Sequence, residues 1–163
     1  MPIQVTYDHA AMVSQIIADL SDYEAVLEVL RRTVAIPAET SQESTNYVVE
    51  RIRRAYYWTT KHAPPRYRIK ILPRISEDVK RQLSEREIAA LASLADSLEA
   101  REWTPIDLKA EIYRIAREVT KMSPKRFFQV IYLVFFGQKS GPQLAPFILS
   151  LDERSVVERL RAL

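Results

Sequence analysis

Cysteine is absent from the sequence, which excludes disulfide bonds, thiolate metal ligands and a thiol nucleophile. The two histidines, His9 and His62, do not have the spacing of metal ligands. No apolar run reaches the length of a membrane span, and no charged start followed by an apolar stretch indicates secretion. We therefore expect a cytoplasmic protein with no metal site and no membrane partner.

Glycine is also scarce, since it occurs only at Gly137 and Gly141, while few stretches alternate polar and apolar residues. This composition favours an all-α chain. Capping residues and apolar spacing predict helices over about 6–20, 21–37, 40–61, 84–98, 104–119, 123–136, 141–151 and 152–163. Pro64-Pro65 ends the third helix, and we expect a multi-helix bundle or helical cage with two small helical subdomains, 1–72 and 73–163.

Charge is distributed unevenly, although the net charge is only +3. Residues 1–50 hold two arginines and eight acids, whereas residues 51–74 hold eight bases and no acid. Such segregation is typical of a surface that faces a polyanion. The basic stretch begins on the predicted third helix, so we expect a cationic face on the first subdomain.

The predicted third helix divides into two stripes. The stripe assigned to the core is Val48, Ile52, Ala55, Tyr56 and Thr59. Lys and Arg contact phosphates and aromatic rings stack on unpaired bases, so RNA rather than DNA is the expected partner of the other stripe. The candidate RNA-binding residues of this stripe are Arg51, Arg54, Trp58 and Lys61, and Arg66 and Arg68 follow them in the predicted extended segment after the helix. The alternative is a solvated cationic face whose aromatic residues belong to the core.

Both glycines mark one turn between two predicted helices. Ser123-Pro124 starts the first helix, and Gly137 lies where a left-handed cap is expected. Gly141-Pro142 opens the second, which places Lys139 and Ser140 beside a helix N-terminus able to attract an anion such as phosphate. The alternative is that the glycines only let two helices fold back tightly.

No constellation of catalytic residues is present. Lys121-Met122-Ser123 resembles part of a nucleotide-contacting loop, but Pro124 follows it and no glycine-rich phosphate loop accompanies it. Acidic residues lie mainly at helix starts or on exposed helical positions, where solvation explains them. We therefore predict no active site in this chain.

Motifs in both predicted subdomains carry a family resemblance. They are Tyr57-Trp58 followed by His62-Ala63-Pro64-Pro65, Glu102-Trp103-Thr104, the run from Phe127 to Phe147 around Gly137-Gln138-Lys139-Ser140-Gly141-Pro142, Ser150-Leu151-Asp152, and Val157-Glu158-Arg159-Leu160. Through them, most of the chain resembles the C-terminal anticodon-binding domain of class I lysyl-tRNA synthetases. That family usually has Arg and then Leu-Gly after Gly-Pro, whereas Gln143 and Ala145 depart from the pattern here.

The resemblance implies an RNA-binding domain of protein biosynthesis that does no chemistry alone, with residues 73–163 as the anticodon-binding cage. It implies that the intact enzyme is a lysine-tRNA ligase, which joins lysine to tRNA(Lys) using ATP and magnesium. A catalytic Rossmann domain outside this chain would bind both cofactors, so none is expected here. It also implies that Lys139, Ser140 and Gln143 of the turn contact the RNA.

Two alternatives stay open. Glutamyl-tRNA synthetases share the Gly-x-x-Ser-Gly-Pro turn and the closing Arg-Leu, so the chain is alternatively an anticodon-binding domain of that family. A further alternative is a non-catalytic helical interaction module whose cationic face meets an acidic protein.

Overall fold

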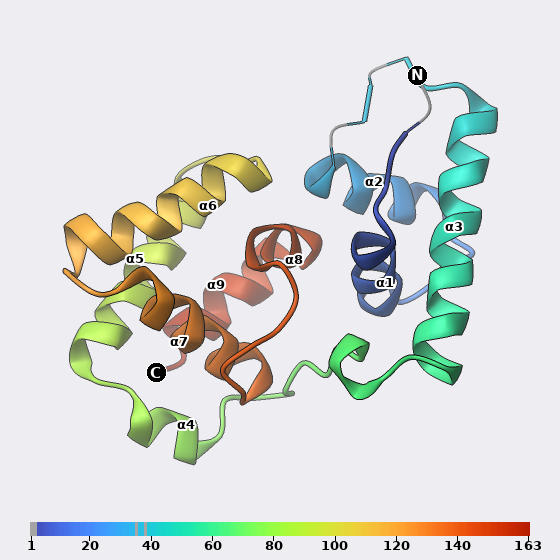
Figure 1. Cartoon of the computed structure of the whole chain (residues 1–163). Coiled ribbons are helices and arrows are strands. Elements are labelled where there is room, and N and C mark those ends of the chain that lie inside the picture. The colour runs from blue at the N-terminus through green and yellow to red at the C-terminus, as the bar shows by residue number, and fades with distance from the viewer. Residues whose placement is uncertain (1–2, 35, 38) are drawn as a thin grey trace. The chain divides into compact units, whose positions relative to one another are not determined.

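The computed structural model describes residues 3–34, 36, 37 and 39–163, and all regular structure in this part of the chain is helical. This confirms the predicted all-α class. The chain divides into two compact units, Met1–Ile69 and Lys70–Leu163. The first contains α1 (Tyr7–Ile16), α2 (Tyr23–Thr33), α3 (Gln42–Lys61) and the 3-10 turn η1 (Pro65–Tyr67) (Figure 1). The second contains α4 (Glu77–Gln82), α5 (Glu85–Ala100), α6 (Pro105–Arg114), the π-helical turn η2 (Ile115–Val119), α7 (Pro124–Phe136), α8 (Leu144–Ser150) and α9 (Glu153–Arg161).

Side-chain caps begin several helices where the sequence predicts them. Thr6 accepts a hydrogen bond from the His9 amide, and Thr104 accepts one from the Asp107 amide. Two predicted caps were wrong by one residue, because Asp22 rather than Ser21 caps α2 and Ser41 rather than Thr40 caps α3. The first helix is also shorter than predicted, ending at Ile16.

The core of the first unit lies where α1 packs against α3 (Figure 1). Fully buried residues from the two helices include Ala10, Val13, Val48, Ile52 and Ala55. The assignment of Tyr56 to this core was wrong, since the residue is 45% exposed. On α3 it lies one position past the buried Ala55, and the next buried residue is Thr59.

Phenylalanines of α7 and α8 form the centre of the second unit. Phe127, Phe135 and Phe147 are fully buried, and the rings of Phe135 and Phe147 pack edge to face with centroids 5.4 Å apart. Helical spacing predicts these phenylalanines as core rather than base-stacking residues, and their burial confirms it. Ile106, by contrast, is 82% exposed, although helical spacing with Ile112 and Ile115 predicts that it lies on the buried side. It is the second residue of α6, while Leu108 and Ile112 supply the buried side.

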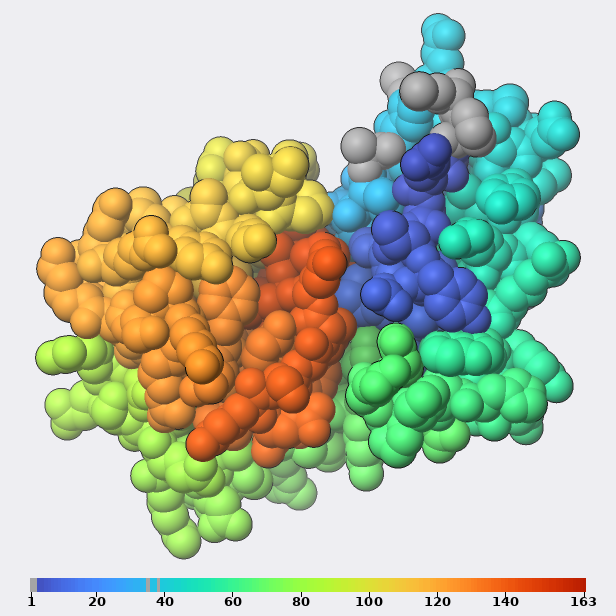
Figure 2. Space-filling model, viewed as in Figure 1, coloured from blue at the N-terminus to red at the C-terminus, as the bar shows by residue number. Residues whose placement is uncertain are grey.

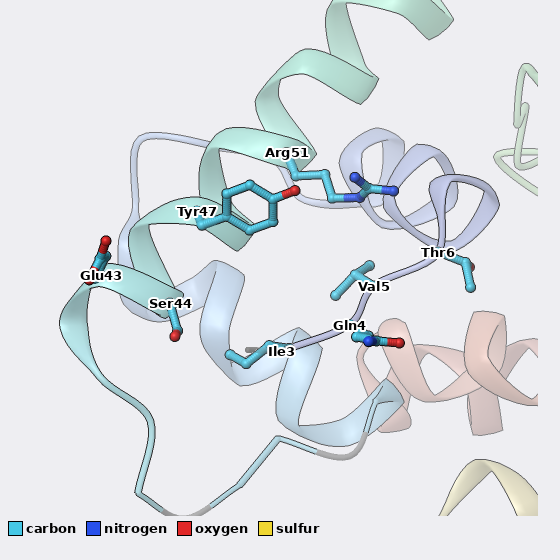
Figure 3. Close-up of a pocket in the computed structure, with 8 residues that line it drawn as sticks. All are labelled: Ile3, Gln4, Val5, Thr6, Glu43, Ser44, Tyr47 and Arg51. Atoms are coloured by element: carbon cyan, nitrogen blue, oxygen red, sulfur yellow. The ribbon is translucent and has the colours of Figure 1, made fainter. Parts of the chain in front are cut away.

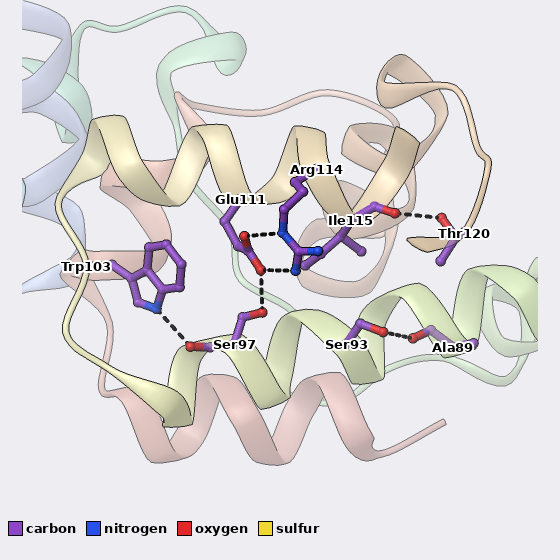
Figure 4. A network of polar contacts seen from close by, with 8 residues as sticks. All are labelled: Ala89, Ser93, Ser97, Trp103, Glu111, Arg114, Ile115 and Thr120. Atoms are coloured by element: carbon purple, nitrogen blue, oxygen red, sulfur yellow. Dashed lines mark hydrogen bonds and ion pairs between the residues drawn. The ribbon is translucent and has the colours of Figure 1, made fainter. Parts of the chain in front are cut away.

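A polar network joins α5 to α6 around Ser97 (Figure 4). The Trp103 indole donates to the Ser97 carbonyl at 2.8 Å, and the Ser97 hydroxyl donates to the Glu111 carboxylate at 2.7 Å. Arg114 also donates to Glu111, and this hydrogen bond is the main reason that the Glu111 pKa lies below its usual value. The turn η2 ends at Val119, and the hydroxyl of the next residue, Thr120, donates to the Ile115 carbonyl.

A second network fixes the start of α5. The Glu87 carboxylate accepts hydrogen bonds from the Ser84 amide and from the Arg126 guanidinium, which ties α5 to α7. Burial alone would raise the pKa of Glu87, but the hydrogen bonds from Arg126 and Ser84 outweigh it, so the pKa is lowered.

We expect Glu87→Gln to lower the free energy of unfolding by about 1 kcal/mol at pH 7, because the charge-assisted bond to Arg126 is lost. The folded-state pKa is depressed, so the wild-type advantage is present above the unfolded pKa and disappears as pH falls through the folded value. Urea unfolding between pH 7 and pH 3 measures this difference. The exposed Glu85→Gln on the same helix serves as control, and an equal effect from both would contradict the prediction.

Candidate nucleic-acid interface

The basic face of the first unit consists of the predicted residues Arg51, Arg54, Lys61, Arg66 and Arg68. The first three lie on α3, while Arg66 lies in η1 and Arg68 follows it. Lys61, Arg66 and Arg68 are exposed and form no ion pair with any carboxylate among the described residues. Uncompensated cations on an exposed surface are suited to phosphate contact.

Arg51 and Arg54 lie three residues apart but have different surroundings. The side chain of Arg54 is 78% exposed, and its Nε donates to the Glu50 carboxylate at 3.2 Å. The absence of acids from residues 51–74 suggests that Arg54 is unpaired, but this is wrong, because Glu50 precedes the acid-free stretch by one residue. Arg51 is half-buried instead, and its Nε finds no hydrogen-bond acceptor among the described residues.

Trp58 is enclosed by two tyrosines. Its ring packs edge to face with Tyr7 at a centroid distance of 5.3 Å and with Tyr67 at 5.2 Å. These contacts connect the end of α3 to the start of α1 and to η1. A base could stack only on the part of the indole that the tyrosines leave open, whereas Tyr47 and Tyr57 on the same helix are each 61% exposed.

A groove of about 630 Å3 opens beside the first half of α3. Tyr47 and Arg51 lie on one side of it, and Ile3 and Val5 of the extended N-terminal segment lie on the other (Figure 3). Gln4, Thr6, Glu43 and Ser44 complete its lining. Glu43, the acid among these lining residues, is at the far end of the groove from Arg51 in this view.

The α7–α8 turn, residues 137–143, lies on the surface of the second unit and carries Lys139, Ser140 and Gln143, all of them exposed (Figure 2). Gly137 caps α7 with φ of 69°, which confirms the predicted left-handed cap. Gly141 has no such conformation. A Cβ at Gly141 would approach ring carbons of Tyr132 and Phe136 to 2.9 Å, so close approach explains this glycine. The Tyr132 hydroxyl donates to the Pro142 carbonyl at 2.7 Å and holds the turn in place.

Helix α8 begins at Leu144, three residues after Gly141, where the sequence predicts its start. Its first residues, Leu144 and Ala145, are buried, and Pro146 in the same turn has no amide hydrogen. The amide of Phe147 already donates to the Gln143 carbonyl. This helix start therefore offers few free donors for an anion, and the arrangement favours the tight fold-back between two helices.

Sequence reasoning missed Tyr47 and the 3–6 segment as parts of a site. The exposed position of Tyr47 could have been found, since it lies four residues before Arg51 and so on the same helix face. The groove itself could not, because residues 3–6 and α3 are distant in sequence. Within the described residues, no cluster of three or more metal-ligating side chains occurs, and no helix is long and apolar enough to cross a membrane.

Comparison with known proteins gives a consistent result. A family model described as "Anticodon binding domain" matches residues 8–163. The lysine–tRNA ligase of Aeropyrum pernix is 29% identical over 161 residues, which are 98% of this chain and 29% of that protein. Those of Pyrococcus furiosus and Archaeoglobus fulgidus are 34% and 32% identical over 85% and 97% of this chain. The chain spans less than a third of the length of these relatives.

Proposed function

The chain belongs to the anticodon-binding domain family, and from this premise we propose that it binds the anticodon region of a transfer RNA. The observation that supports this most is the match of the family model to nearly the whole chain. The similar proteins are lysine–tRNA ligases, so we propose tRNA(Lys) as the RNA and a lysine–tRNA ligase as the intact protein. ATP and magnesium would serve the intact enzyme, and we assign neither to residues of this chain.

The domain acts by positioning RNA. Lys61, Arg66 and Arg68 of the basic face contact phosphates, which fixes the orientation of the RNA without selecting its sequence. The exposed side chains of Lys139 and Gln143 on the α7–α8 turn contact base edges, which carry the sequence information. Holding the anticodon in this way leaves the acceptor end of the tRNA free to reach a separate catalytic domain.

We expect the chain to bind a tRNA transcript with a lysine anticodon more tightly than one with a glutamate anticodon, and affinity to fall steeply with salt. Lys61→Ala should weaken both transcripts equally and reduce the salt slope by about one, because one phosphate contact is lost. Filter binding across a salt series measures both effects. Lys109→Ala, an exposed lysine of α6 outside the basic face, is the matched control and should leave the slope unchanged.

Each of the two alternative functions predicts a different result in this binding experiment. Preference for the glutamate anticodon would assign the chain to a glutamyl-tRNA synthetase. If tRNA affinity depends on neither the anticodon nor the salt concentration, the proposed function is contradicted. That result would favour an interaction module with an acidic protein partner.

A further inference from the structure

The groove beside α3 contains an unsatisfied charged donor. The Arg51 Nε is buried and without an acceptor among the described residues, although the guanidinium keeps its charge at neutral pH. Buried polar groups in folded proteins are almost always hydrogen bonded, because an unmade bond to a charged group is costly. The Nε itself has no accessible surface, so a ligand in the groove would accept from the outer nitrogens of the same guanidinium, which lines the groove.

The other lining residues limit what that ligand is. Tyr47 lies one helical turn before Arg51, lines the groove, is 61% exposed, and points its hydroxyl end toward Arg51 (Figure 3). Ile3 and Val5 opposite are apolar and nearly fully buried. A flat ring with one acceptor edge would stack on the tyrosine, cover the apolar wall and accept from the arginine.

We propose that this groove binds one unstacked nucleobase that carries a carbonyl group, with Arg51 donating to that carbonyl and Tyr47 stacking on the ring. Guanine, uracil and cytosine carry an exocyclic carbonyl, whereas adenine presents an amino group. The inference rests on the proposed function, because RNA is the expected source of the base. It goes beyond that function by assigning a base site to the first unit, partly formed by residues 3–6, which precede the family match at residue 8.

The first experiment compares two equally exposed tyrosines of α3. Tyr47→Ala should weaken tRNA binding about tenfold, the usual effect of losing one stacked base. Tyr57→Ala, which removes a ring of equal exposure that does not line the groove, should change affinity less than twofold. Tyr47→Phe keeps the ring and should retain wild-type affinity. Circular dichroism of each variant checks that α3 remains folded.

The second experiment uses free nucleotides, which separates a base site from a general RNA surface. Uridine and guanosine monophosphates should shift the NMR methyl signals of Ile3 and Val5 in a saturable way, while adenosine monophosphate should shift them far less. Arg51→Gln should abolish this preference, and Arg54→Gln should leave it intact, because Arg54 lies outside the groove lining.

The outcomes distinguish this inference from the proposed function. Wild-type tRNA binding with equal effects of Tyr47→Ala and Tyr57→Ala, and no methyl shifts, would overturn the groove site and leave the proposed function standing. Methyl shifts with uridine monophosphate in a chain that binds no tRNA would support a free-nucleotide site and overturn the proposed function. Equal shifts with all nucleotides would refute the role of Arg51.

Discussion

Arg159→Ala is expected to lower the free energy of unfolding of the second unit by about 3 kcal/mol. The half-buried guanidinium donates to the carbonyls of Leu72, Pro73 and Val134 and lies 5.5 Å from the centroid of the Phe135 ring. Burial also lowers its pKa, although the group stays charged. Its removal takes this donor from three carbonyls and the tie to α9 from the 72–73 segment, although the Leu72 amide still donates to the Phe135 carbonyl of α7.

Urea unfolding followed by near-ultraviolet circular dichroism measures this loss, which corresponds to a melting temperature lower by roughly 15 °C for a unit of this size. Arg154→Ala on the same helix is the matched control, because its ion pair with Glu158 is exposed on both sides. That control should cost less than about 0.5 kcal/mol. Equal destabilisation by the two variants would show that Arg159 has no special structural role.

Gly141→Val is expected to destabilise the second unit by about 3 kcal/mol and to weaken RNA binding through displacement of the α7–α8 turn. Even a single Cβ at this position would lie 2.9 Å from ring carbons of Tyr132 and Phe136, inside normal contact distance. Both rings come from the last turns of α7 and pack within the unit, so neither can move freely. Thermal melting and tRNA filter binding report the two effects separately.

The cause of the Gly141 effect can be tested with a double-mutant cycle. Gly141→Ala should be less harmful in a Tyr132→Leu background, because the smaller side chain makes room for the Cβ. Gly137→Ala should instead cost about 1–2 kcal/mol in either background, since its penalty comes from the φ of 69°. Additive free energies for Gly141→Ala and Tyr132→Leu would mean that contact with the Tyr132 ring is not the cause and would leave the Phe136 ring as the remaining close contact.

Helical content and most helix starts followed from local chemistry. Thr6, Ser84, Thr104 and Asp152 cap helices as their side chains predict, because capping depends on groups within three residues. Apart from the two caps that lie one residue later than predicted, predictions failed where tertiary packing decides. Gly141 shows this most clearly, since periodicity suggested a helix start and the structure has a turn pressed against two aromatic rings.

The candidate site was predictable in its charge but not in its geometry. The acid-free stretch identified the basic face, yet the sequence could not separate Arg51 from Arg54, which differ in burial and in pairing. Helical spacing placed Trp58 on the cationic stripe, but its two tyrosine neighbours come from α1 and η1. Contacts between segments distant in sequence decide both cases.

The position of the two tryptophans has a spectroscopic consequence. Trp58 lies half-buried between two tyrosines in the first unit, and Trp103 lies half-buried in the second, where Arg101 stacks 3.7 Å from its ring centroid. They are the only tryptophans in the sequence. Replacing one with phenylalanine leaves a single tryptophan in one unit, so tryptophan emission, excited at a wavelength that tyrosine does not absorb, reports the opening of that unit without an attached dye.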